Sequence, residues 1–313
     1  MTALEEARNF SEDVLRTMRE AIAAKLPADH LVVTCGSFAR RDASSSSDMD
    51  YYSVIESKGP LATKWDDQLK SIIQENGIKP PADGGAFATN VRKTELLRNY
   101  GGSKDTSKSI TQCMLYLLEG DYLSAKDKFD NLRSKIIEKY VDNTPRDHQI
   151  AFYLLNDLVR YWRTITVDYA DKTYGRKNKK PFGLRNIKLV YSRKLIYTSG
   201  LFSIALTADR TRDAKCEILK MLFSMSPVDR IKYVCGDESS RRLIEIYNYF
   251  IEKISDPAIR DILESLENDD ERSRKDPTFR ELKNEGHYFS REAFGLLQRT
   301  FHASHPIHMA VVF

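Results

Sequence analysis

The sequence predicts an α+β protein in which a small mixed β-sheet with flanking helices is followed by an all-helical domain. Two short apolar segments in the first third of the chain, 31–35 and 50–55, have the length and the polar borders of strands. In the remaining two thirds, apolar residues recur at steps of three and four, the period of amphipathic helices. We therefore expect a first domain over residues 1–105 and a helical domain over residues 106–313, with a short subdomain from about residue 275.

The elements of the first domain follow from apolar periodicity and from residues that break helices. Residues 2–26 repeat apolar side chains at helical spacing, and Pro27 marks the end of this helix before the first strand. After the second strand, a helix is expected over about 61–75, and the glycine- and proline-rich segment 77–85 is expected to form a loop.

The second domain is expected to be helical almost throughout. Ile110, Met114 and Leu117 form an amphipathic stripe, and Tyr122 and Leu123 continue it. No convincing strand pattern returns after this point, so the sheet should be confined to the first domain.

Composition and charge exclude several classes of protein. The 313 residues are 41% hydrophobic and 30% charged, which is ordinary for a globular protein and leaves little room for disorder. The formal net charge of +4 is too small to indicate non-specific DNA binding, so any contact with nucleic acid must come from a local patch.

Cysteine usage and hydropathy bear on the location of the protein. The four cysteines are far apart and form neither a C-x-x-C pair nor a disulfide framework, which suits a reducing cytoplasm. The acidic N-terminus lacks the apolar segment of a signal peptide, and no apolar run approaches the roughly 18–20 residues of a membrane helix. We expect a cytoplasmic protein without a membrane partner.

The segment between the two strands holds the residues with the clearest chemistry. Asp48 and Asp50 are two residues apart, so on an extended chain both carboxylates project from one face, about 7 Å apart, and can share a divalent cation. The first strand runs into Gly36 and Ser37, whose small size lets backbone N–H groups and a hydroxyl approach an anion closely. This layout is expected of an enzyme that handles nucleoside triphosphates.

The same region resembles the G-S-x-x-R and S-D-x-D signature of the DNA-polymerase-β-like nucleotidyltransferase superfamily, in the segments Gly36–Arg40 and Ser47–Tyr51 with Asp42 between them. The close resemblance covers residues 31–56. A looser one, to the helical companion domains of bacterial nucleotidyltransferases related to PII uridylyltransferase, extends to about residue 200.

The resemblance implies a function and a set of site residues. Asp48 and Asp50 would hold Mg²⁺ or Mn²⁺, and Gly36, Ser37 and Arg40 would bind the phosphates of a nucleoside triphosphate. For Arg40, an ordinary solvated position in a turn is the alternative. The nucleotidyl group would pass to a hydroxyl on an acceptor that is a protein, an RNA or a small molecule.

The third carboxylate that most members of the superfamily use is not evident. The segment 84–91, where its strand should lie, contains no acid. Asp83, Glu95 and Asp105 flank that segment, and we favour Asp105 because the glycine pair before it permits close approach of the backbone. Without a third acid, the chain would be a catalytically degenerate regulator that binds a nucleotide without transferring it.

A basic segment in the helical domain offers a further contact. Nine lysines and arginines fall within residues 172–194, interleaved with tyrosines. Lys188 is the leading candidate to bind the triphosphate; alternatively, the segment binds the phosphate backbone of an RNA acceptor. The second option would fit a toxin that modifies tRNA.

Two other patterns favour structural interpretations. In the helix expected over 148–172, Asp157 and Arg160 are spaced for an ion pair, although Arg160 is also a candidate for a contact in the active site. His302, His305 and His308 suggest a metal cluster by residue type, but a proline between them interrupts the helix that would align them. A surface tail is the favoured interpretation of these histidines.

Overall fold

The computed structural model describes residues 1–56, 64–81, 90–97, 106–142, 147, 149–174 and 181–311. The chain divides into two compact units. The first contains Met1 and Glu5–Asn143, and the second contains Thr144–Phe313 together with Thr2–Leu4. The unit with the sheet thus extends to Asn143 and includes helices that the sequence analysis assigned to the helical domain.

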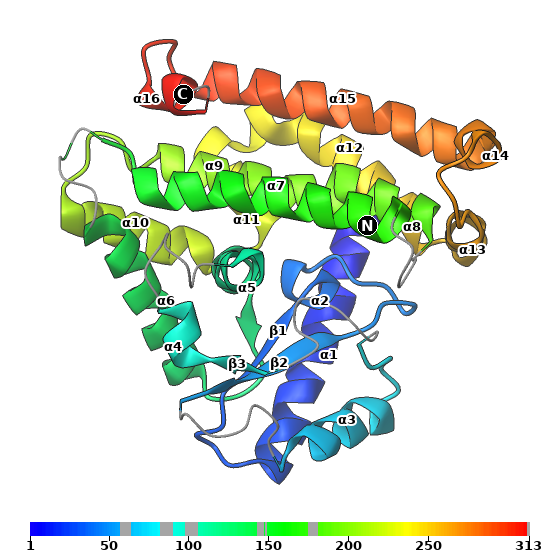
Figure 1. Ribbon diagram of the computed structural model, residues 1–313, viewed down its shortest axis with the longest axis horizontal. Coiled ribbons are helices and arrows are strands. Elements are labelled where there is room, and N and C mark those ends of the chain that lie inside the picture. The colour runs from blue at the N-terminus through cyan, green and yellow to red at the C-terminus, as the bar shows by residue number, and fades with distance from the viewer. Residues whose placement is uncertain are drawn as a thin grey trace. The chain divides into compact units, whose positions relative to one another are not determined.

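Four strands form the sheet of the first unit, in the order β3-β2-β1-β4 (Figure 1). They are β1 (Val32–Cys35), β2 (Asp50–Ile55), β3 (Val91–Arg92) and β4 (Asp121–Tyr122). Strand β1 pairs antiparallel with β2 and β4, whereas β2 pairs parallel with β3, so the sheet is mixed. The expected α+β class is confirmed, and β1 and β2 lie where the apolar segments predicted them.

One face of the sheet is covered by α1 (Ala3–Lys25) and α3 (Asp66–Glu75). Their apolar stripes form a core cluster with Val32 of β1 and with Met49, which directly precedes β2. This cluster includes Leu15, Met18, Ile22, Leu69, Ile72 and Ile73, each fully or almost fully buried. Burying one such side chain stabilises the fold by about 1.5–3 kcal/mol before entropy is counted.

The opposite face packs against α5 (Ser107–Leu118), whose Cys113 and Tyr116 lie beside Tyr52 of β2. Thr106 caps α5 in a reciprocal box with Ser109. Helix α6 (Lys126–Asp142) follows β4, and the hydroxyl of Tyr116 donates to the carbonyl of Phe129 in α6. Two single helical turns, α2 (Ser37–Arg40) and α4 (Lys93–Leu96), complete the described elements of this unit.

Strand β4 corrects an expectation from the sequence. The helical stripe predicted to run on through Tyr122 and Leu123 is wrong, because α5 ends at Leu118 and the chain turns into β4. At Gly120 a Cβ would lie 2.6 Å from the carbonyl oxygen of Tyr116, so the turn passes too close to the end of α5 for any side chain. The N–H of Leu123 then donates to the carbonyl of Val32 at 2.8 Å, which fixes β4 on the edge of the sheet.

All described elements of the second unit are helical. A π-helical turn, η1 (Leu189–Arg193), joins α8 and α9 into one continuous helix. The bounds of the helices are α7 (Phe152–Tyr174), α8 (Phe182–Lys188), α9 (Lys194–Ala205), α10 (Arg212–Phe223), α11 (Pro227–Cys235), α12 (Asp237–Ser255), α13 (Pro257–Ser265), α14 (Glu271–Lys275), α15 (Pro277–Thr300) and α16 (Pro306–Ala310).

Aromatic side chains hold the helices of the second unit together. Tyr191 of η1 stacks on Phe250 of α12 with ring centroids 4.5 Å apart, and its hydroxyl donates to the carbonyl of Leu282 in α15. The chain after residue 275 therefore packs as part of this unit. None of the helices in the described residues combines the length and the apolar character that a membrane span needs.

Candidate functional site

The two aspartates of the signature flank a residue of the core. Met49 is fully buried in the core cluster, whereas Asp48 and Asp50 are only partly buried. The N–H of Met49 donates to the carbonyl of Lys79 at 2.9 Å, and Asp48 forms a parallel bridge with Lys79, so the chain is extended here. Because side chains alternate along an extended chain, both aspartates lie on the face opposite Met49.

The pairing of β1 with β2 brings the glycine turn to Asp50. Cys35 lies opposite Asp50, so Gly36 is the first residue past the pair. A Cβ built on Gly36 would lie 2.9 Å from Oδ2 of Asp50, so the carboxylate occupies the space that a side chain at this position would need. The backbone of Gly36 has φ 78° and ψ −151°, a conformation that is essentially restricted to glycine. Only glycine both adopts this backbone conformation and leaves room for the Asp50 carboxylate.

Ser37 opens the helical turn α2 directly after that glycine. Its carbonyl accepts the N–H of Asp42 at 2.9 Å, which closes the turn. The side chain is partly exposed, and within the described ranges its hydroxyl has no hydrogen-bond partner. The first N–H groups of a helical turn have no acceptor within the turn, so backbone donors accompany this hydroxyl. Gly36, Ser37, Asp48 and Asp50 are thus gathered at one end of β1 and β2.

Arg40 has a different environment from the one the signature suggested. Its Nε and Nη2 donate to the two carboxylate oxygens of Asp42 at 2.9 and 3.1 Å, and its Nη1 donates to Glu119 at 2.7 Å. The side chains of these three residues are 8%, 3% and 1% exposed. A guanidinium so enclosed joins α2 to the end of α5, and we therefore remove Arg40 from the nucleotide-binding residues.

Asp121 of β4 is the nearest acid along the sheet, but it points away from Asp50. Thr34 lies opposite both Tyr51 and Asp121, so these three side chains share one face of the sheet, whereas Asp50 is on the other. Oδ2 of Asp121 pairs there with Arg19 of α1 at 2.8 Å and also with the side chain of Arg41. Asp121 therefore does not serve as a third carboxylate beside Asp48 and Asp50.

Of the other three candidates for a third carboxylate, the described residues include Glu95 alone. Asp83 and Asp105 lie outside the described residues. Glu95 belongs to α4, which follows β3 at the end of β2 remote from Asp50. Across the part of the chain that is described, no group of three or more His, Cys, Asp or Glu side chains is placed to hold a metal ion. Within the described residues, the candidate site therefore contains two carboxylates, those of Asp48 and Asp50.

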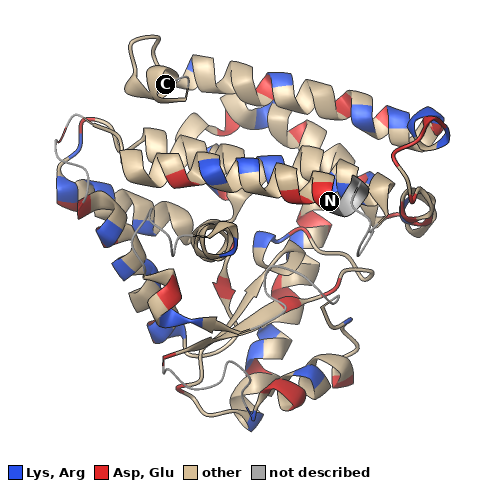
Figure 2. Cartoon of the chain, in the orientation of Figure 1, with Lys and Arg blue, Asp and Glu red and all other residues tan. Residues whose placement is uncertain are grey.

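The residues expected from the helical half belong to the second unit. Lys188 is the last residue of α8, immediately before the π-helical turn, and is partly exposed. Much of the basic segment before α8, residues 175–180, lies outside the described residues. Figure 2 shows acidic and basic residues interspersed along α7. Arg160 pairs on that helix with Asp157 at 2.7 Å, and the Asp157 side chain is 2% exposed, which favours the structural interpretation of this pair.

The three C-terminal histidines make local hydrogen bonds rather than a common site. Nδ1 of His305 accepts the N–H of Ile307 and caps α16, and Nε2 of His308 lies 3.1 Å from the carbonyl oxygen of Phe301. Phe301 and Ile307 are buried, so this segment packs against its unit instead of forming the expected surface tail.

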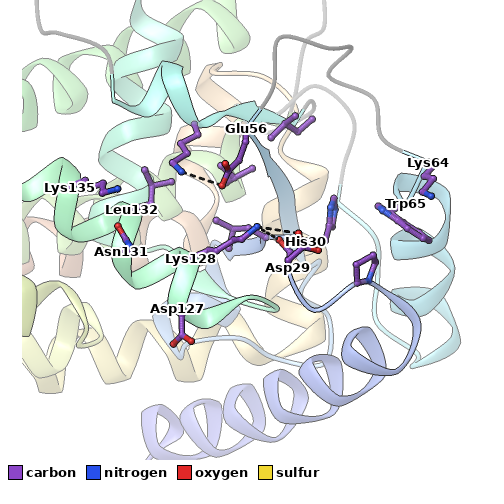
Figure 3. A pocket seen from close by; sticks show the side chains of 15 residues that line it. Asp29, His30, Glu56, Lys64, Trp65, Asp127, Lys128, Asn131, Leu132 and Lys135 are labelled. Atoms are coloured by element: carbon purple, nitrogen blue, oxygen red, sulfur yellow. Dashed lines mark hydrogen bonds and ion pairs between the residues drawn. The ribbon is translucent and has the colours of Figure 1, made fainter.

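A cavity of about 480 Å³ opens at the other end of the sheet (Figure 3). It is lined by the loop from Pro27 to Leu31, by the end of β2 and by α6. From Asp50 to Ile55 the strand rises about 3.3 Å per residue, so the cavity lies roughly 16 Å from the aspartates. Sequence patterns did not single out any of its residues, because they come from five separate segments that only the fold brings together.

The chain was also compared with known proteins. No protein-family model matches it, and no curated protein sequence matches it.

Proposed function

We propose that the chain is a Mg²⁺-dependent nucleotidyltransferase, which moves a nucleoside monophosphate from a nucleoside triphosphate to a hydroxyl on an acceptor. The observation that supports this most strongly is the close approach of the Asp50 carboxylate to Gly36, where it fills the space a side chain would need. It joins a pair of carboxylates to a turn that offers a hydroxyl and backbone N–H groups, which are the groups that metal-bound phosphates need.

The donor set fits a hard divalent cation. Asp48 and Asp50 supply oxygen ligands of the kind Mg²⁺ and Mn²⁺ prefer, and the Asp48 carboxylate has neither a hydrogen-bond nor an ion-pair partner among the residues described. Oxygen ligands from the triphosphate and from water would complete the coordination. When bound, the metal lowers the pKa of the attacking hydroxyl and neutralises charge on the departing pyrophosphate.

The residues of the chain act by holding and orienting the reactants. The hydroxyl of Ser37 and the N–H groups of the turn after Gly36 bind phosphate oxygens, while Asp48 and Asp50 would hold the cation that neutralises the phosphates beside them. The acceptor oxygen forms a bond to the α-phosphorus as the bond to the bridging oxygen of the β-phosphate breaks. Pyrophosphate leaves, and the proton of the acceptor hydroxyl passes to solvent water.

Two further assignments belong to the proposal. We keep Lys188 as a contact for the triphosphate or for an RNA acceptor because it stands in a strongly basic stretch of sequence. We also propose a cytoplasmic location, in keeping with the four cysteines, which are all free thiols.

Incubation with each labelled nucleoside triphosphate, Mg²⁺ and cell extract tests the proposal. Transfer of label should occur with the unaltered protein, fall by at least about a thousandfold in Asp48→Asn and Asp50→Asn, and persist in the control Asp67→Asn, which neutralises an exposed acid of α3. The labelled band identifies the acceptor as protein, RNA or small molecule. Full pyrophosphate release by Asp50→Asn would contradict the proposal.

A catalytically degenerate, nucleotide-binding regulator is the second candidate. The site contains two carboxylates in the described part of the chain, whereas most members of the superfamily that the sequence resembles use three. Nucleotide binding measured by calorimetry, without label on any component of the extract, would favour this candidate. Label on tRNA, together with growth arrest that Asp48→Ala relieves, would instead identify a toxin.

A further inference from the structure

The cavity at the end of the sheet opposite Gly36 has the walls of a ligand site. Its volume of about 480 Å³ lies within the range of pockets that hold small organic ligands. Leu31, Val54 and Leu132 provide apolar surface. In Figure 3, Trp65 and Lys64 stand on one side of the cavity, and Lys135 stands on the other.

Four lysines and three acids line the cavity, and part of this charge is already paired. Lys93 of α4 lies 3.2 Å from Glu56, and Lys128 of α6 lies 3.5 Å from Asp29. Lys135 of α6 has no ion-pair or hydrogen-bond partner in the described ranges. A cation is therefore available on the α6 wall, one helical turn from the side-chain amide of Asn131.

The wall across from Lys135 is aromatic. Trp65 precedes α3 and is partly buried against the core cluster, with the ammonium group of Lys64 4.5 Å from its ring centroid. A large, partly exposed indole at the mouth of a cavity offers a surface on which a flat ring can stack.

His30 lies between these two walls (Figure 3). Its Nε2 is 2.9 Å from the hydroxyl of Ser53, so one ring nitrogen is engaged and the other remains for a ligand. Burial lowers the pKa of His30, against smaller opposing effects of Asp66 and Asp29. The imidazole is therefore neutral at pH 7 and supplies a polar group without adding charge.

We propose that this cavity is a second ligand site, which binds a nucleoside monophosphate with its base against Trp65, its sugar near His30 and its phosphate on Lys135 and Asn131. Along the cavity, an aromatic ring is followed by a neutral polar group and then by a cation. This is the order in which a nucleoside monophosphate presents its base, its sugar and its phosphate. The site is separate from the proposed catalytic aspartates and does not depend on their function.

Tryptophan fluorescence reports on this cavity directly. The chain has two tryptophans, so Trp162→Phe leaves Trp65 as the sole reporter. Adenosine 5′-monophosphate is titrated without divalent cations in an Asp50→Asn background, which keeps the proposed catalytic site out of the measurement. We expect a saturable change in Trp65 emission, with adenosine and inorganic phosphate each binding at least about tenfold more weakly.

Two matched variants on α6 test the role of the cation. Lys135→Gln should weaken binding of the monophosphate about tenfold, whereas Lys126→Gln, which removes a lysine of the same helix that does not line the cavity, should leave it unchanged. Both lysines are exposed, so neither change threatens the fold. The absence of a saturable change, equal affinity for adenosine, or equal effects of the two variants would overturn the proposal.

Discussion

Replacing Gly36 by alanine tests how the turn and the aspartate are joined. At φ 78° and ψ −151°, a residue with a Cβ is strained, and conformations of this kind cost about 1–3 kcal/mol. The new methyl group would also stand 2.9 Å from Oδ2 of Asp50, closer than a carbon and an oxygen normally approach. The carboxylate must therefore move by several tenths of an ångström, away from the position in which we propose that it binds metal.

Gly236→Ala is the matched control for this substitution. Gly236 also combines a positive φ with an extended ψ, φ 81° and ψ 152°, but a Cβ there meets no atom within 4 Å. Denaturant unfolding should show that both variants lose about 1–3 kcal/mol, and nucleotidyl transfer should fall at least tenfold only in Gly36→Ala. Equal transfer activity in the two variants would refute the reasoning, as would a negligible loss of stability in Gly36→Ala.

Two further substitutions probe the first unit. Arg40→Met should lower the free energy of unfolding by about 3–5 kcal/mol, because it removes the guanidinium that pairs with the buried carboxylates of Asp42 and Glu119. The control Arg16→Met, at an exposed ion pair, should lower it by less than about 1 kcal/mol. Similar losses in the two variants would make Arg40 a candidate phosphate ligand again. His30 has a pKa lowered below 6.5 by burial, so below pH 6.5 the unfolded chain takes up a proton before the folded protein and stability falls with pH. The difference in free energy of unfolding between the unaltered protein and His30→Gln should therefore shrink from pH 7.5 to pH 5.5. A difference that grows over this range would show that burial does not lower the pKa of His30.

The sequence predicted those parts of the fold that local patterns determine. The apolar segments, Pro27 and the helical periodicity located α1, β1 and β2 to within a few residues. It did not predict β4, because a two-residue edge strand has no periodicity of its own and is stabilised by hydrogen bonds to β1. The glycine at 120 was the available signal, since a glycine directly after a helical stripe often marks the end of the helix.

The candidate site was predictable in part for a similar reason. The proximity of Gly36 to Asp50 follows from the antiparallel pairing of two strands that are consecutive in the sequence. The role of Arg40 was not predictable, because its second partner, Glu119, is 79 residues away and reaches it only once α5 has packed. The cavity beside Trp65 was likewise invisible, since its walls come from segments that no single motif contains.

Binding of Mn²⁺ in the presence of a nucleoside triphosphate, followed by electron paramagnetic resonance, tests the central claim most directly. The account predicts that the unaltered protein and the control Asp67→Asn bind the ion with equal affinity, and that Asp48→Asn and Asp50→Asn each weaken binding at least tenfold. Unchanged affinity in both signature variants would show that these carboxylates do not hold the metal, and the proposed site would be wrong.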